Sequence, residues 1–172
     1  ITNYPTYNWE LISDMYTNNV VGLDIELHKH VFWEISITKK GKYINHFMSG
    51  DIFLSPYSMI IIRPDDIHYL KLKGTNCEYR DIYITDEQMK ELCDLFSKSL
   101  YDELKNALTP IVCKIDRAHA DSIEATALSI SNQKLTMKQE EIQAIDKCLI
   151  IKCIDAYLES KIEVNYDAPQ WL

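Results

Sequence analysis

The stretch that decides the fold is GLDIELHKHVFWEISITKKG, residues 22–41. Apolar and polar residues alternate over 23–28, which is the period-two pattern of a strand whose two faces differ. Aromatic and β-branched residues continue over 32–38, and Gly41 then allows a tight turn. The stretch therefore predicts two strands, separated by short turns from each other and from the chain that follows.

Three polar side chains in this stretch form the sharpest chemical pattern. His28, His30 and Glu34 share parity, so in a regular strand they project from one face. Two imidazoles and a carboxylate are three parts of a site for zinc, iron, manganese or nickel, and His68 is the candidate for a fourth ligand. Alternatively, the four side chains line a barrel and hydrogen-bond an organic ligand, water or one another.

Glycine and proline divide the chain into two halves. All four glycines lie within 22–74, and no proline occurs between Pro110 and Pro169. Turns between strands use glycine and helix interiors exclude proline, so we expect a β-rich first half and an α-rich second half. Further strands are predicted at 43–47, 52–54, 59–62, 68–72, 78–84 and 111–115, and helices at 8–16, 86–96, 101–108, 117–130 and from 136 to about 159. Thr85 and Asp116 are the predicted N-caps, and Thr136 with Gln139 fits a capping box.

The last predicted helix is apolar on more than one side. Its C-terminal half adds a second apolar face, made of Ile150, Ile151, Ile154, Tyr157 and Leu158. A helix with two apolar faces is buried on two sides. The barrel would cover one side. The other is covered either by a second copy of the chain, with Ile150, Ile151, Ile154 and Leu158 as the dimer interface, or by another helix of the same chain.

The histidine pattern resembles that of a known superfamily. The spacing from Gly22 through His28, His30 and Glu34 to Gly41 matches the first conserved motif of the cupins, whose strands form a double-stranded β-barrel. The second cupin motif is matched loosely, since His68 arrives one residue early. Together with the following segment, Arg63-Pro64-Asp65-Asp66-Ile67-His68-Tyr69, the pattern resembles the N-terminal sensor domains of AraC/XylS-type transcription regulators.

That resemblance implies an α+β fold with three parts. A cupin-like barrel (jelly roll) would occupy 1–84, and a helical dimerisation region, with a last strand at 111–115, would occupy 85–165. Residues 166–172 would begin the linker to a DNA-binding domain that this chain lacks. DNA would then be bound only through a C-terminal helix-turn-helix domain, and the sensor would form a homodimer.

Composition excludes several other functions. The formal charge of −8 makes the chain a poor ligand for a phosphate backbone. No apolar run approaches the roughly 20 residues that cross a bilayer, so no membrane partner is expected. Five cysteines without a Cys-x-x-Cys pair indicate reduced thiols in a cytoplasmic protein.

These observations favour a domain that senses a small effector and is not an enzyme. The effector would be a small polar molecule such as a sugar, bound by His28, His30, Glu34 and His68 and stacked on the aromatic rings of Trp33 and Tyr43. No cofactor is expected beyond a metal at the same four polar residues. The alternatives are a metal-dependent cupin enzyme, an isomerase or a dioxygenase, and an inert scaffold without a ligand.

Overall fold

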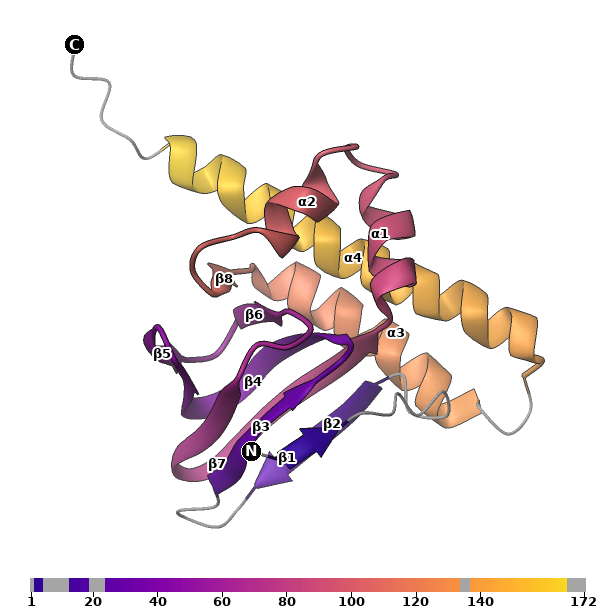
Figure 1. Cartoon of the computed structure of the whole chain (residues 1–172). Coiled ribbons are helices and arrows are strands. Elements are labelled where there is room, and N and C mark those ends of the chain that lie inside the picture. The colour runs from indigo at the N-terminus through magenta and orange to yellow at the C-terminus, as the bar shows by residue number, and fades with distance from the viewer. Residues whose placement is uncertain (1, 5–12, 19–23, 134–136, 167–172) are drawn as a thin grey trace.

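The computed structural model describes residues 2–4, 13–18, 24–133 and 137–166 (Figure 1). Its strands are β1 (Thr2–Tyr4), β2 (Ser13–Asn18), β3 (Asp24–His30), β4 (Trp33–Phe47), β5 (Gly50–Leu54), β6 (Ser58–Ile62), β7 (His68–Ile84) and β8 (Ile111–Lys114). Its helices are α1 (Asp86–Cys93), α2 (Leu100–Lys105), α3 (Arg117–Gln133) and α4 (Gln139–Tyr166). The strands form one curled sheet, and the helices gather on one side of it (Figure 1). The predicted α+β class and cupin-like barrel are confirmed.

Two long strands, β4 and β7, form the frame of this sheet. They pair antiparallel from Trp33 opposite Ile84 to Phe47 opposite His68, with register shifts between residues 38 and 42 of β4. On its other edge β4 pairs first with β6 and then with β5, while β7 pairs with β2 and β3. Each long strand therefore contributes to both ends of the barrel.

The predicted turn at Gly41 is instead a bend within β4, so the strands expected at 32–38 and 43–47 are one. Gly41 has φ +79°, and a Cβ at this position would lie 2.6 Å from Sγ of Cys77. Only glycine tolerates that backbone conformation and that contact together. The bulge twists the strand without ending its pairing with β7.

Because of the register shifts between residues 38 and 42 of β4, odd-numbered residues before and after them belong to two different apolar cores. Trp33, Ile35 and Ile37 belong to the larger core, which lies between the sheet and the helices. Tyr43 belongs to the smaller one, inside the barrel, with Leu54, Ile60, Ile62, Leu70, Leu72, Cys77 and Tyr79. The barrel interior is thus partly filled by side chains, and its remaining polar positions define where a ligand can bind.

The helix starts agree with the predicted caps where the structure describes them. The Thr85 hydroxyl accepts from the Gln88 N–H and the Gln88 side chain reaches back, which completes a capping box. Asp116 Oδ1 accepts from the N–H of His119 at 2.7 Å, as an N-cap does. The helix predicted at 8–16 is wrong over 13–16, which lie in β2, and 5–12 are outside the described residues. The capping box predicted at 136–139 is also outside them at Thr136.

The second apolar face of α4 is covered by the chain itself. Ile150 and Ile154 are 0% and 1% exposed and belong to the core shared with the sheet and the other helices. Ile151 and Leu158 are half-buried against the same core. The dimer interface predicted at these residues is therefore wrong for Ile150 and Ile154, because α1, α3 and β8 pack on α4. None of the helices in the described ranges is both long and apolar enough to cross a bilayer.

A buried carboxyl of α4 gives the stability of the helical layer a pH dependence. Asp146 is 3% exposed; its Oδ2 accepts from Gln88 at 3.3 Å, and its Oδ1 is buried without a hydrogen-bond partner. Burial raises the pKa of Asp146 to about 6, against the lowering effect of Gln88. Because the folded pKa lies above the unfolded one, the free energy of unfolding falls as pH rises from about 4 to about 6.

Replacing Asp146 by Asn should therefore stabilise the protein at neutral pH. We expect the free energy of unfolding at pH 7 to rise by about 2 to 3 kcal/mol, from about 1.4 kcal/mol for each pKa unit. The gain should shrink to about 0.5 kcal/mol at pH 4, where the carboxyl is protonated in the folded state and about half protonated in the unfolded chain. Urea titrations of both proteins at pH 4 and pH 7 measure this, and equal gains at the two pH values would contradict it.

Candidate functional site

Three of the four predicted site residues meet inside the barrel. His28 on β3 lies opposite His68 on β7, and their ring centroids are 4.2 Å apart. The His30 ring is 5.4 Å from His68 and 6.1 Å from His28. One ring nitrogen from each histidine lies within 4.8 Å of the others, and all three side chains are buried. This group is called the histidine cluster below.

Hydrogen bonds fix the orientation of each imidazole. Nδ1 of His28 lies 2.7 Å from the carbonyl oxygen of Glu26, and Nδ1 of His30 lies 2.6 Å from that of Phe32. Nδ1 of His68 lies 3.2 Å from Oδ1 of Asn45. Because these oxygens only accept, each Nδ1 carries the hydrogen. In the neutral rings the lone pair is then on Nε2, and the Nε2 atoms of His30 and His68 are buried without a hydrogen-bond partner.

Charge in the cluster is set by burial and by Glu34. Burial lowers the pKa of His68 to about 4, so this ring is neutral at pH 7. Burial alone would raise the pKa of Glu34, but the hydrogen bond and charge of His30, with the charges of His68 and His28, lower it overall. Its Oε2 lies 3.4 Å from Nε2 of His30. A carboxylate and an imidazole lone pair that face each other require a proton, a ligand donor or a cation between them.

The donor set fits a divalent metal with three nitrogen ligands. Each Nδ1 is held by an oxygen, as in metal sites where the second ring nitrogen binds the ion. His28, His30 and His68 are the residues that would hold the metal, whereas Glu34 contacts His30 and lies outside the group within 4.8 Å. Of the four predicted ligands, the three histidines thus converge, and the Glu34 carboxylate lies next to them.

Of the two aromatic residues predicted at the site, Trp33 faces away from the cluster and Tyr43 faces the barrel interior, while two phenylalanines stack on the imidazoles. Trp33 lies on the opposite face of β4, in the core under the helices, where its indole N–H donates to Asp86. Tyr43 is in the inner core and is hydrogen-bonded to Ser36 at 3.1 Å. Phe32 stacks on His30 with centroids 4.3 Å apart, and Phe47 stacks on His68 at 5.6 Å.

Sequence reasoning missed Asn45 and Phe47. Both share the face of β4 that carries Tyr43, and Asn45 is a polar residue, 2% exposed, in the middle of a strand. A buried amide in such a position has a hydrogen-bond partner, which is the signal that could have found it. The partner itself follows only from the pairing of β4 with β7, where Asn45 lies opposite Leu70 and Phe47 opposite His68.

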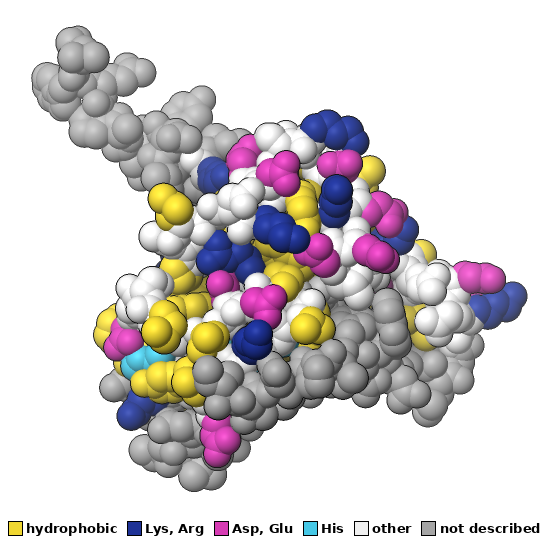
Figure 2. Space-filling view, viewed as in Figure 1, with side chains coloured by type: hydrophobic (Ala, Val, Ile, Leu, Met, Phe, Trp, Pro, Cys, Tyr) yellow, Lys and Arg dark blue, Asp and Glu magenta, His cyan; other side chains and the backbone are white. Residues whose placement is uncertain are grey.

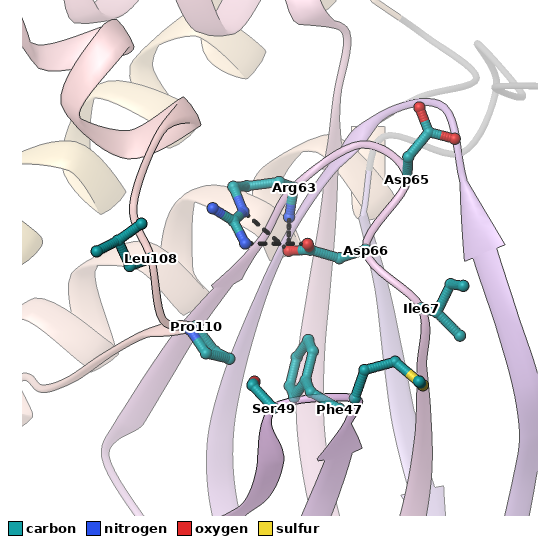
Figure 3. Close-up of a pocket in the computed structure, with 9 residues that line it drawn as sticks. Phe47, Ser49, Arg63, Asp65, Asp66, Ile67, Leu108 and Pro110 are labelled. Atoms are coloured by element: carbon teal, nitrogen blue, oxygen red, sulfur yellow. Dashed lines mark hydrogen bonds and ion pairs between the residues drawn. The ribbon is translucent and has the colours of Figure 1, made fainter.

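A pocket of about 290 Å³ opens beside the cluster (Figure 3). It is formed by the β4–β5 turn, the β6–β7 turn and the α2–β8 loop, and its lining residues are Phe47, Met48, Ser49, Arg63, Asp65, Asp66, Ile67, Leu108 and Pro110. The Phe47 ring stands between Pro110 and Ile67, below the Arg63–Asp66 ion pair (Figure 3). Phe47 therefore separates the pocket from His68, on which its ring stacks.

One wall of the pocket is an ion pair fixed by hydrogen bonds, and its opening is lined by exposed apolar side chains. Arg63 forms two 3.0 Å hydrogen bonds to the Asp66 carboxylate and also donates to the carbonyl oxygen of Ala107, which ties the β6–β7 turn to the α2–β8 loop. Met48 and Leu108 on the rim are 86% and 97% exposed. Apolar side chains gather at this end of the sheet, around β5, whereas charged side chains of both signs cover α1 and α2 (Figure 2).

Comparison with known proteins places this barrel in a family. The model of the family described as the AraC-like ligand binding domain matches residues 10–134. The chain belongs to this family. No curated protein matches the chain. Because the matched range spans the barrel and α3, the histidine cluster lies within the AraC-like ligand-binding domain.

Two solved structures share the fold at low sequence identity. Apo ToxT K231A from Vibrio cholerae strain SCE256 is 11% identical, with a TM-score of 0.59 over 90% of this chain and 56% of that one. The AraC-like transcriptional activator CuxR is 12% identical, with a TM-score of 0.51 over 74% of this chain and 42% of that one. The chain thus spans about half the length of the solved proteins it matches.

Proposed function

We propose that this AraC-like ligand-binding domain senses a small polar effector in the barrel, at the histidine cluster and the adjoining pocket. The observation that carries the proposal is the buried Nε2 atom of His68, which has no hydrogen-bond partner and lies close to that of His30, which faces the Glu34 carboxylate at 3.4 Å. Buried polar atoms are nearly always satisfied, so the His68 nitrogen is expected to accept a hydrogen bond from a bound ligand. Hydroxyl groups of a sugar-sized molecule are suitable donors.

The geometry suits a ligand that is polar on one side and carries C–H surface on the other. Phe47 and Phe32 supply flat apolar faces next to the imidazoles. The Arg63–Asp66 pair and Ser49 supply polar groups in the pocket. The pocket volume is at the lower end for small-molecule sites, which favours a compact effector.

A metal-dependent enzyme is the second candidate, supported by the converging nitrogens of the histidine cluster. A bound divalent ion would supply a Lewis-acid centre for a carbonyl or hydroxyl oxygen. His28, His30 and His68 would hold it, and Glu34, as a carboxylate, would accept a proton from a substrate next to it. About one tightly held metal ion per chain, together with turnover of a small substrate, would favour this candidate over the sensor.

A route from the barrel to the helices supports regulation. Arg80 on β7 and Lys39 on β4 both contact Glu124 on α3, at 2.6 and 3.2 Å. An effector that binds one arrangement of barrel and helices more tightly shifts the population toward it. We propose that the helices transmit this shift to a DNA-binding region of a longer, dimeric regulator. The five free cysteines fit the reducing cytoplasm.

Ligand screening with two histidine variants tests the proposal. Calorimetry and thermal shift should find at least one monosaccharide or other small polyol that binds the wild type. His68→Leu should weaken this binding at least tenfold, because one hydrogen bond of about 1.4 kcal/mol is lost. His46→Leu is the matched control, because His46 pairs with Asp51 and stacks on Tyr69 instead of joining the cluster. Equal affinity of wild type and His68→Leu would place the binding site elsewhere.

A further inference from the structure

A second group of metal-ligating side chains lies on the helical layer, away from the barrel. His119 is in the first turn of α3, and Asp155 and Glu159 are on α4. One ligand atom from each lies within 4.8 Å of the other two. Asp155 and Glu159 are four residues apart, so both carboxylates share one face of α4. Neither the sequence pattern nor the effector site uses these residues.

The His119 imidazole is held in the orientation that a metal ligand needs. Its Nδ1 lies 3.0 Å from Oδ1 of Asp116, the carboxylate that also caps α3 through the His119 N–H. The carboxylate only accepts, so Nδ1 carries the hydrogen and Nε2 is left as the free donor atom of the neutral ring. Carboxylate–histidine pairs of this kind orient metal-binding imidazoles in proteins.

The second ring nitrogen points at the carboxylates of α4. His119 Nε2 lies 3.6 Å from Oε2 of Glu159. In a tetrahedral zinc site with bonds of about 2.0 to 2.1 Å, neighbouring ligand atoms are about 3.3 Å apart. Small rotations of the partly exposed side chains are therefore enough to close the three ligands around one ion.

The negative charges of Asp155 and Glu159 also favour binding of a cation. Two like charges at positions i and i+4 of a helix repel each other. Among the side chains that the structure describes, within 26–72, 76–130 and 137–161, no lysine or arginine lies within ion-pair distance of Asp155 or Glu159, and His119 is the partner of Glu159. Lys152, three residues before Asp155, instead donates to Thr126 at 2.7 Å, and Lys161, two residues after Glu159, lies 3.9 Å from Glu103. Apart from His119, the two carboxylates thus have no cationic partner among the described side chains.

We propose that His119, Asp155 and Glu159 bind a divalent cation of the zinc class, which links the start of α3 to the C-terminal half of α4. One imidazole and two carboxylates suit Zn²⁺, Co²⁺ or Mn²⁺ better than Mg²⁺ or Ca²⁺, which prefer oxygen ligands alone. Water completes the coordination, since all three side chains are partly or fully exposed. The ion fastens α4 to the layer that packs on the barrel.

Zinc titration of the whole chain by calorimetry tests this site. His119→Ala should weaken one binding event at least 100-fold, and Asp155→Asn or Glu159→Gln should weaken the same event at least tenfold. Asp116→Asn should weaken it about tenfold, as expected for a partner that orients the ligand. Asp121→Asn is the matched control, because it removes an exposed carboxylate of α3 that pairs with Arg117.

The histidine cluster is a separate place where zinc could bind, so His68→Leu and the double variant with His119→Ala are titrated in parallel. His68→Leu should retain the event that His119→Ala abolishes. Zn²⁺ should also raise the melting temperature of His68→Leu and leave that of the double variant unchanged. If His119→Ala binds zinc with the stoichiometry and affinity of the wild type, or if His68→Leu alone removes all binding, the proposed site is overturned.

Discussion

Replacing Ile154 by Asp is expected to leave the chain unfolded at 25 °C. Ile154 is 1% exposed and lies in the core between the sheet and the helices. The substitution removes a buried aliphatic side chain and places a carboxylate where no partner is available. Each of these changes costs several kcal/mol, and their sum reaches the total stability of a typical domain. Far-ultraviolet circular dichroism and urea titration measure the loss.

The matched control for this substitution is Leu128→Asp on α3. Leu128 is 43% exposed, so its carboxylate would remain in water and the free energy of unfolding should change by about 1 kcal/mol or less. If Ile154→Asp stayed folded and only its sedimentation changed, α4 would present this face to a second copy of the chain. That outcome would contradict the packing described above.

The face of α4 shows what periodicity determines and what it leaves open. Two apolar stripes predicted burial on two sides, and the burial of Ile150 and Ile154 agrees with this. Periodicity describes one helix at a time, so it does not identify the element that covers a stripe. Here the cover comes from α1, α3 and β8 of the same chain. The alternative of a partner subunit was equally consistent with the sequence.

At the histidine cluster, too, the sequence pattern predicted which residues share a face of one strand but not which residues of other strands they contact. The shared parity of His28 and His30 was readable because both lie on one strand with a two-residue period. The contacts of His68 with Asn45 and Phe47 depend on the register of β4 against β7, which the bend at Gly41 shifts. Trp33 was misplaced because it is the sequence neighbour of Glu34, and adjacent residues of a strand lie on opposite faces.

The pocket was out of reach of sequence reasoning for a related reason. Three loops that are distant along the chain form it, and the hydrogen bonds of Arg63 to Asp66 and Ala107 hold two of them together. The segment 63–69 was recognised by its resemblance to sensor domains, but no local pattern shows that Arg63 reaches across to the loop after α2. A periodic pattern in the sequence carries no information about long-range contacts of single side chains.

Glu124→Ala is expected to lower the free energy of unfolding by about 3 to 5 kcal/mol. Arg80 is 3% exposed, and its guanidinium binds both oxygens of Glu124, at 3.0 and 2.6 Å. Without Glu124, a buried cation loses its counter-charge and two hydrogen bonds. Lys39→Ala is the control: Lys39 contacts the same carboxylate at 3.2 Å but is a third exposed, so its loss should cost about 1 kcal/mol or less.

The double variant Arg80→Met/Glu124→Leu distinguishes the cost of an unpaired charge from the worth of the pair. Replacing a buried ion pair by apolar side chains of similar size is often neutral or stabilising, so most of the loss in Glu124→Ala should be recovered.

The ion pair also makes stability depend on pH. Burial raises the pKa of Glu124, but the hydrogen bonds and charges of Arg80 and Lys39 lower it overall. The pair therefore stabilises the fold above the ordinary glutamate pKa, and this stabilisation decreases as pH falls below that value. The double variant should lose this part of the acid sensitivity. A double variant as unstable as Glu124→Ala would show that the ion pair itself, and not relief of a stranded charge, holds α3 on the barrel.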